Sequence, residues 1–189
     1  MPSVMIHLLT AYKLFADTDP LFYIGAIVPD AVATREEKDI THFRTIQNRE
    51  NELINLAKSS KKSFDEGILL HLYLDWLWDE RTFCTYAETH KEENWFYSYR
   101  REIALASAFI YHNERWSEDV WQKMLSCPKD TYGTTPGVSD GEVAEFLNRN
   151  YIWHKDNNIG PSVVYPPEFV EEFTNNATEK FMVWRSSIN

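Results

Sequence analysis

One segment limits the possible folds of this chain more than any other: the run from Gly67 to Trp78, with the sequence GILLHLYLDWLW. It is apolar on every side of a helix, and a helix that is apolar all round is normally buried. Ser63 and Glu66 have the spacing of a capping box, which predicts that the helix begins at Ser63, and the pattern continues to about Glu88. The sequence therefore predicts a long helix in the interior of the fold.

The rest of the chain also has helical patterns, with no internal repeat and no convincing strand. The nearest candidate for a strand, residues 162–165, is too short to matter. Helices are expected at about residues 3–15, 19–28, 46–57, 92–113, 117–125, 139–150 and 167–185, with loops at 30–44 and 128–140. We therefore predict an all-α fold, a compact helical bundle with irregular connections, in which residues 1–189 form a single domain.

Composition and charge exclude several classes of protein. The hydrophobic fraction of 43% suffices for a sizeable core. A net charge of -10 argues against binding to duplex nucleic acid or to anionic membrane surfaces. The chain contains no run of about 18 apolar residues, so we expect no membrane insertion. The N-terminal segment lacks the basic region of a signal peptide. Cys84 and Cys127 do not form a CxxC pair, so we interpret them as free thiols of a cytoplasmic protein.

The apolar helix carries two residues that a buried helix rarely tolerates, His71 and Asp75. They are four positions apart, so both project from one face and can reach the same ion. A buried carboxylate is costly unless it is paired or bound to a metal. No basic residue lies within a turn of Asp75, and Asp79 adds a further negative charge on nearly the same face. The alternative is a neutral histidine hydrogen-bonded to an ionised aspartate in the core.

Three more candidate ligands precede this helix. His7 lies among apolar residues of the first predicted helix, Asp30 directly follows Pro29, and His42 lies in a polar segment. Taken singly, they are more typical of a core histidine, a loop aspartate and a partly exposed loop histidine, respectively, than of metal ligands. Together with the apolar helix they form a set of imidazoles and carboxylates without thiolates, which suits zinc and also manganese or iron.

The order of these residues resembles the zinc-dependent phospholipase C family, which shares one all-helical fold with the S1/P1 nucleases. The resemblance is carried by His7, Gly25-x-x-x-Pro29-Asp30, Thr41-His42-Phe43 and His71-x-x-x-Asp75, and it covers about residues 5 to 80. No motif in the second half of the chain extends it.

The resemblance implies a multinuclear zinc site that hydrolyses phosphate esters. One zinc would be held by Asp30, His42, His71 and Asp75, and Asp75 would bridge to a second zinc that His7 also binds. The family holds a third zinc through a second His-x-x-x-acid element. That element is absent here, because no acid stands four residues after any of the later histidines, His90, His112 and His154. We therefore expect one or two ions.

The expected chemistry is metal-assisted hydrolysis of a small phosphate-ester substrate. Paired ions can activate water and stabilise charge on a phosphoryl oxygen, and Asp30 is the candidate general base. Two alternatives stay open. One is a nucleotide phosphohydrolase, although the adjacent His-Asp pair typical of one such class is missing. The other is a metal-stabilised helical interaction protein without catalytic activity.

Overall fold

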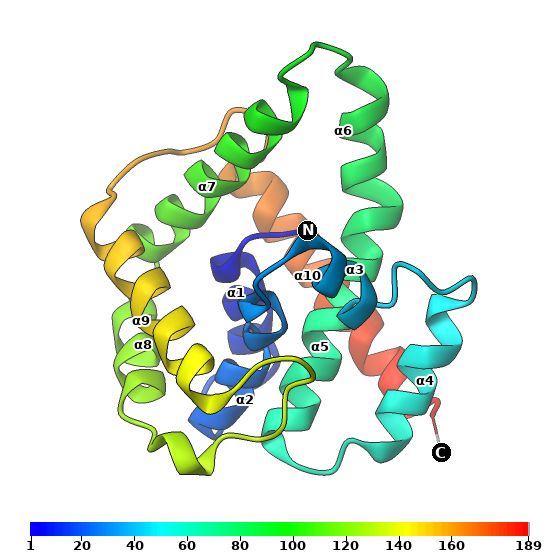
Figure 1. Cartoon of the computed structure of the whole chain (residues 1–189). Coiled ribbons are helices and arrows are strands. Elements are labelled where there is room, and N and C mark those ends of the chain that lie inside the picture. The colour runs from blue at the N-terminus through cyan, green and yellow to red at the C-terminus, as the bar shows by residue number, and fades with distance from the viewer. Residues whose placement is uncertain (189) are drawn as a thin grey trace.

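Helix α1 (Val4–Leu14) lies at the centre of the fold, and the other helices surround it in the computed structural model (Figure 1). The structure describes residues 1–188. Ser3 caps α1 by accepting a hydrogen bond from the Ile6 N–H group, and all residues from Met5 to Ala11 are buried. The first helix of the chain is therefore a core element.

The described residues contain helices and no strand, so the predicted all-α fold is confirmed. The remaining α-helices are α2 (Pro20–Gly25), α3 (Arg35–Thr41), α4 (Arg49–Ser59), α5 (Ser63–Trp78), α6 (Cys84–Thr89), α7 (Trp95–Asn113), α8 (Ser117–Leu125), α9 (Asp140–Asp156) and α10 (Pro167–Ser186). Two 3-10 turns, η1 (Val28–Ala31) and η3 (Lys129–Thr131), and one π-helical turn, η2 (Asp79–Phe83), complete the described elements.

The closest helix pair consists of α2 and α5, which meet at two glycines. A Cβ atom on Gly25 would overlap the carbonyl oxygen of Phe64, and one on Gly67 would overlap the carbonyl oxygen of Phe22. Only a residue without a side chain allows the two backbones to approach this closely. This contact brings the end of α2 against the first turns of α5, one turn before His71 of the candidate site.

The predicted loop at residues 30–44 is wrong, because α3 lies within it. Thr34 and Glu37 form a complete capping box there, in which each side chain bonds the other residue's backbone N–H group. No residue of α3 is buried, so the sequence carries no hydrophobic periodicity to reveal the helix.

The capping box predicted at Ser63 is also wrong. Lys62 precedes the first helical residue of α5, and the structure shows no side-chain cap there. Glu66 instead forms an ion pair with Arg185, at 2.6 Å between Oε1 and Nη2. The Glu66 carboxylate, which the sequence pattern predicts to cap the start of α5, therefore contacts α10 instead.

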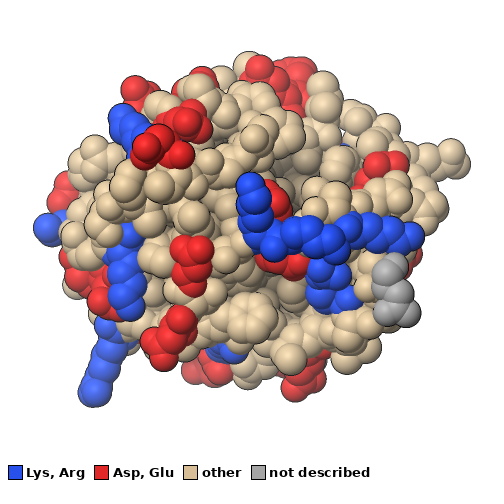
Figure 2. Space-filling view, turned by 90° about the horizontal axis from the view of Figure 1, so that it is seen from below, with Lys and Arg blue, Asp and Glu red and all other residues tan. Residues whose placement is uncertain are grey.

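The acidic excess does not make every face uniformly negative. Figure 2 shows Lys and Arg side chains beside Asp and Glu side chains on one face of the molecule. Among the described residues, no helix has the length and apolar character needed to cross a membrane.

A buried histidine in the second half gives the fold a testable pH dependence. His154 Nδ1 donates to the Asn150 carbonyl oxygen at 2.7 Å, and Nε2 lies 2.8 Å from the Ser107 hydroxyl oxygen. Burial lowers the pKa of His154 from 6.5 to about 4, so the ring is neutral in the folded protein at pH 7. The unfolded chain binds this proton more readily, and protonation of His154 therefore favours unfolding.

We expect the His154 contribution to be complete above pH 6.5 and to be lost as the pH falls towards 4. The loss amounts to ~3 kcal/mol, since each pKa unit corresponds to about 1.4 kcal/mol. Urea unfolding of the wild type and of His154→Gln at pH 7 and at pH 4.5 measures it. The variant should lose less stability between the two pH values, and equal losses in both proteins would contradict the assignment.

Candidate metal centre

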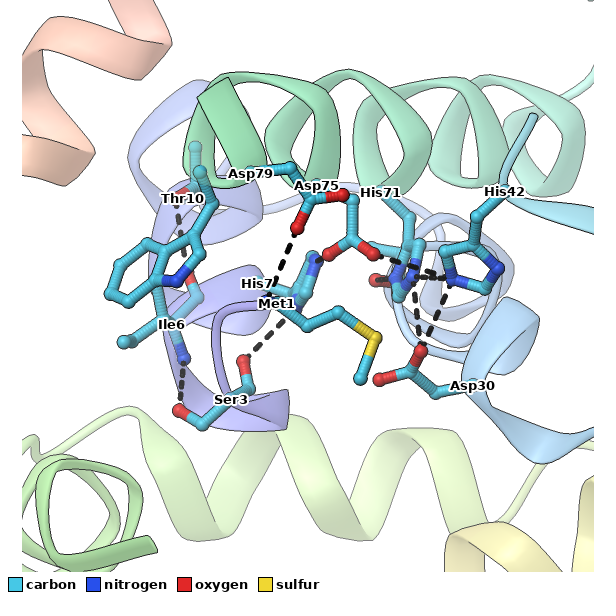
Figure 3. Close-up of polar contacts among 12 residues, drawn as sticks. Met1, Ser3, Ile6, His7, Thr10, Asp30, His42, His71, Asp75 and Asp79 are labelled. Carbon is cyan, nitrogen blue, oxygen red and sulfur yellow. Dashed lines mark hydrogen bonds and ion pairs between the residues drawn. The ribbon is translucent and has the colours of Figure 1, made fainter. Parts of the chain in front are cut away.

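All five residues singled out in the sequence as metal ligands meet at one point of the fold (Figure 3). His7 comes from α1, Asp30 from η1 and His42 from the end of α3, while His71 and Asp75 project from α5. The side chains of His7, His42, His71 and Asp75 are fully buried. The Asp30 side chain is 12% exposed. Segments far apart in the sequence therefore form one buried cluster.

Four of these residues form a compact set of donor atoms. One ligand atom each from Asp30, His42, His71 and Asp75 lies within 4.8 Å of the other three. Asp30 Oδ1 lies 3.2 Å from His42 Nε2 and 3.4 Å from His71 Nε2. Asp75 Oδ2 lies 3.5 Å from His42 Nε2, and its Oδ1 lies 3.4 Å from His7 Nε2. Asp75 thus presents its two oxygens to different histidines.

Hydrogen bonds outside the cluster determine which ring nitrogen of each histidine carries a proton. His7 Nδ1 lies 2.9 Å from the Ser3 carbonyl oxygen, and His71 Nδ1 lies 2.8 Å from the Ala26 carbonyl oxygen. A carbonyl oxygen only accepts, so both Nδ1 atoms donate. Thr41 Oγ1 donates to the Lys38 carbonyl oxygen, so it accepts from His42 Nδ1 at 3.1 Å.

In their neutral forms, all three histidines therefore direct an Nε2 lone pair into the cluster. The Nε2 atoms of His42 and His71 are 3.1 Å apart. His7 Nε2 and Asp75 Oδ1 are buried without a hydrogen-bond partner, and Asp30 Oδ1 is in an ion pair with Lys38. Lone pairs and carboxylates at these separations repel each other, and a cation among them removes that repulsion.

Burial and neighbouring charges shift several pKa values. Burial, together with His71, lowers the pKa of His7, which keeps the His7 ring neutral at pH 7. Burial raises the pKa of Asp30, but the Lys38 ammonium together with a protonated His71 lowers it by more, so the pKa lies well below its usual value. Burial also raises the pKa of Asp75, and a hydrogen bond from a protonated His7 together with positive charge on His42 and His71 holds it well below its usual value. Both carboxylates are therefore ionised at neutral pH.

The arrangement fits a divalent metal with nitrogen and oxygen ligands. A tetrahedral zinc with bonds of 2.0–2.2 Å separates its ligand atoms by about 3.3–3.6 Å. Four of the six separations within the four-donor set are 3.1–3.5 Å, and all six lie within 4.8 Å. Metal-binding histidines typically donate their other N–H group to a backbone carbonyl or similar acceptor. His7 and His71 both do so.

Phe43, which follows the candidate ligand His42, has a strained backbone conformation. Phe43 has a φ of 57°, in the left-handed region that non-glycine residues rarely adopt. It lies between His42, whose ring points into the cluster, and Arg44, whose guanidinium contacts Asp75. Such strain persists only where surrounding contacts hold it, and it concentrates at functional sites.

The sequence analysis missed the cations of this site. Lys38 Nζ lies 2.5 Å from Asp30 Oδ1, and Arg44 Nη2 lies 2.9 Å from Asp75 Oδ2. Arg44 Nε and Arg49 Nη1 each lie 2.9 Å from Asp79 Oδ2. The basic partner of Asp75 is therefore 31 positions away in sequence, and no local spacing pattern could reveal it.

The first residue also reaches this region. The Met1 amino group lies 3.5 Å from Asp79 Oδ1 and 3.0 Å from Tyr99 Oη. Tyr99 Oη in turn donates to the Met1 carbonyl oxygen at 2.9 Å. These contacts hold the start of α1, and with it His7, against η2 and α7.

Comparison with known proteins adds no assignment: no family model matches the chain, and neither a curated protein nor a solved structure matches it.

Proposed function

We propose that this protein is a metal-dependent hydrolase of phosphate esters, with zinc as the expected metal and manganese or iron as alternatives. The observation that supports this most is the convergence of three histidine lone pairs on two ionised carboxylates, with His7 Nε2 and Asp75 Oδ1 buried without a hydrogen-bond partner. The resemblance to the zinc-dependent phospholipase C family rests on these same residues, and it is the basis for proposing hydrolysis rather than metal storage.

The donor set suggests a role for each residue. Asp30, His42, His71 and Asp75 would hold one ion, while the second oxygen of Asp75 and His7 would contribute to a second. When bound, the metal supplies Lewis acidity and an activated water at neutral pH. The chain itself orients the ligands through the Ser3, Ala26 and Thr41 hydrogen bonds.

One observation favours the non-catalytic alternative, a metal that only stabilises the fold. Four of the five candidate ligands have no solvent exposure. Only Asp30, at 12%, connects the donor set with solvent. A structural ion needs no such connection, whereas a catalytic one must be reached by water and substrate. Turnover of a phosphate ester therefore decides between the two functions.

The catalytic role of Asp30 is a separate prediction. A carboxylate with a depressed pKa accepts a proton less readily, so the general-base role requires a direct test. Asp30→Asn keeps the shape and one coordinating oxygen. If Asp30 is a base, we expect metal content close to the wild-type value and turnover reduced by roughly 10²–10⁴. Loss of metal together with activity would instead identify Asp30 as a ligand only.

The measurement uses 4-nitrophenyl phosphate and bis(4-nitrophenyl) phosphate, with zinc, manganese or iron supplied, and elemental analysis of each protein. Glu36→Gln is the matched control, because Glu36 is an exposed carboxylate in the first turn of α3. Its turnover should equal that of the wild type. If the wild type hydrolyses neither compound with any of these metals, the hydrolase proposal is wrong and a structural metal site replaces it.

A further inference from the structure

The partly exposed side chains beside the donor set include Asp30, Lys38 and Arg44, which together we call the mouth. Their side chains are 12%, 18% and 22% exposed, whereas the histidines and Asp75 behind them are fully buried. Asp30 is the one candidate ligand with solvent exposure, so a substrate group that approaches it from solvent meets its ion-pair partner Lys38.

The ionisable side chains at the site balance one another before any metal is counted. Asp30, Asp75 and Asp79 each contact a cationic side chain, and these cations are Lys38, Arg44 and Arg49. Asp39, which also contacts Arg44, is paired with Arg35. The histidine rings add no charge in their neutral form. Each divalent ion then adds two positive charges, so the loaded site favours a ligand that carries two negative charges.

Lys38 is the cation that such an ion affects most directly. Its Nζ lies 2.5 Å from Asp30 Oδ1, the same oxygen that faces His42 Nε2 and His71 Nε2. An ion among those three atoms repels the ammonium group, and α3 has no buried residue to fix the lysine in place. Lys38 can therefore turn from Asp30 towards a negatively charged group at the mouth.

We propose that the site takes a terminal phosphate group, as in a phosphomonoester, and that Lys38 binds its oxygens. This inference rests on the proposed function and specifies its substrate. A terminal phosphate is a dianion with one substituent, which can stay on the solvent side of Asp30 and Lys38. A phosphodiester is a monoanion with two substituents, and both would have to fit beside the fully buried ligands. Charge and access thus favour the same group.

Binding of inorganic phosphate tests the role of Lys38 without turnover. The protein is loaded with Co²⁺ as a spectroscopic substitute for zinc, and phosphate is titrated while the visible absorption is recorded. We expect Lys38→Gln to bind phosphate about 10- to 100-fold more weakly, the usual effect of losing a hydrogen bond to a charged group. Lys38→Arg should restore most of the affinity. Arg35→Gln is the control, because this side chain on the same helix is 85% exposed.

Affinity for the metal separates this role from a structural one. Lys38 and the ion compete for Asp30, so Lys38→Gln should bind Co²⁺ at least as tightly as the wild type. A side chain that only supports the fold would weaken binding of both metal and phosphate when removed. Equal phosphate affinity in wild type and Lys38→Gln would overturn the role of Lys38.

Turnover separates the substrate inference from the proposed function. We expect 4-nitrophenyl phosphate to be hydrolysed with at least a tenfold higher kcat/KM than bis(4-nitrophenyl) phosphate, with Lys38→Gln reducing the ratio. Faster hydrolysis of the diester would overturn the substrate inference and leave the hydrolase proposal intact. Lys38-dependent phosphate binding without turnover of either compound would support the phosphate site and overturn the hydrolase proposal.

Discussion

Asp75→Asn is expected to weaken binding of a divalent metal by more than about 100-fold. Loss of a residue that only hydrogen-bonds to a metal ligand typically weakens binding by up to about 100-fold, and loss of a ligand itself should weaken it further. Asp75 presents one oxygen to His42 and the other to His7, at 3.5 Å and 3.4 Å. An amide has the same shape, but it carries no charge and offers one oxygen instead of two.

Asp79→Asn is the matched control, since Asp79 lies one turn further along the same helical run. It contacts Arg44 and Arg49 at 2.9 Å each and does not belong to the four-donor set. Removing it should lower the stability of the metal-free protein and change metal affinity by less than about tenfold, because its partners lie outside the donor set.

Isothermal titration with metal measures the affinity of both variants. Melting curves provide a second readout, because a ligand that binds only the native state raises its stability in proportion to ln(1 + [L]/Kd). Metal should raise the Tm of the wild type and of Asp79→Asn, and leave Asp75→Asn nearly unchanged. Equal losses of affinity in the two variants would show that Asp75 acts as the partner of Arg44 rather than as a ligand.

Alanine at either glycine of the α2–α5 contact is expected to destabilise the protein by about 3 kcal/mol or more, at the upper end of the usual cost of overpacking. Added Cβ atoms at Gly25 and Gly67 would overlap backbone carbonyl oxygens, which cannot rotate away as a side chain can. For a chain of this length, that loss lowers the Tm by about 6–12 °C.

The same substitutions should also weaken the candidate site. The Ala26 carbonyl oxygen, one residue after Gly25, accepts the His71 Nδ1 hydrogen bond at 2.8 Å, so separating α2 from α5 releases that ring. Gly141→Ala is the control: Gly141 lies in the first turn of α9, where an added Cβ meets only Ser139 Oγ at 3.9 Å. Alanine there should be neutral or stabilising by up to about 1 kcal/mol. If Gly25→Ala melts like Gly141→Ala, the close helix contact is not as described.

Much of the helical organisation follows from local sequence. The all-round apolar character of residues 67–78 predicts a buried helix, and residues 67–75 are buried in the structure. Ser3, Asp19 and Ser139 cap the helices that their positions predict. A cap or a hydrophobic period involves neighbouring residues and needs no knowledge of the rest of the fold, and for that reason it is visible in the sequence.

The candidate ligands were visible because buried polar residues are costly in an apolar setting, as His71 and Asp75 are on α5. Their meeting with His7, Asp30 and His42 was an expectation based on resemblance, and the structure brings them together. The metal and the reaction stay predictions.

Only the tertiary structure decided which cations balance those carboxylates. Lys38 lies on a helix that has no buried face and hence no periodicity, and Arg44, which follows the left-handed residue Phe43, contacts Asp75 across 31 positions. The approach of α2 to α5 depends on two glycines 42 positions apart that must face each other. Such pairings depend on the direction in which each helix crosses its neighbours, and no local pattern of residues encodes that direction.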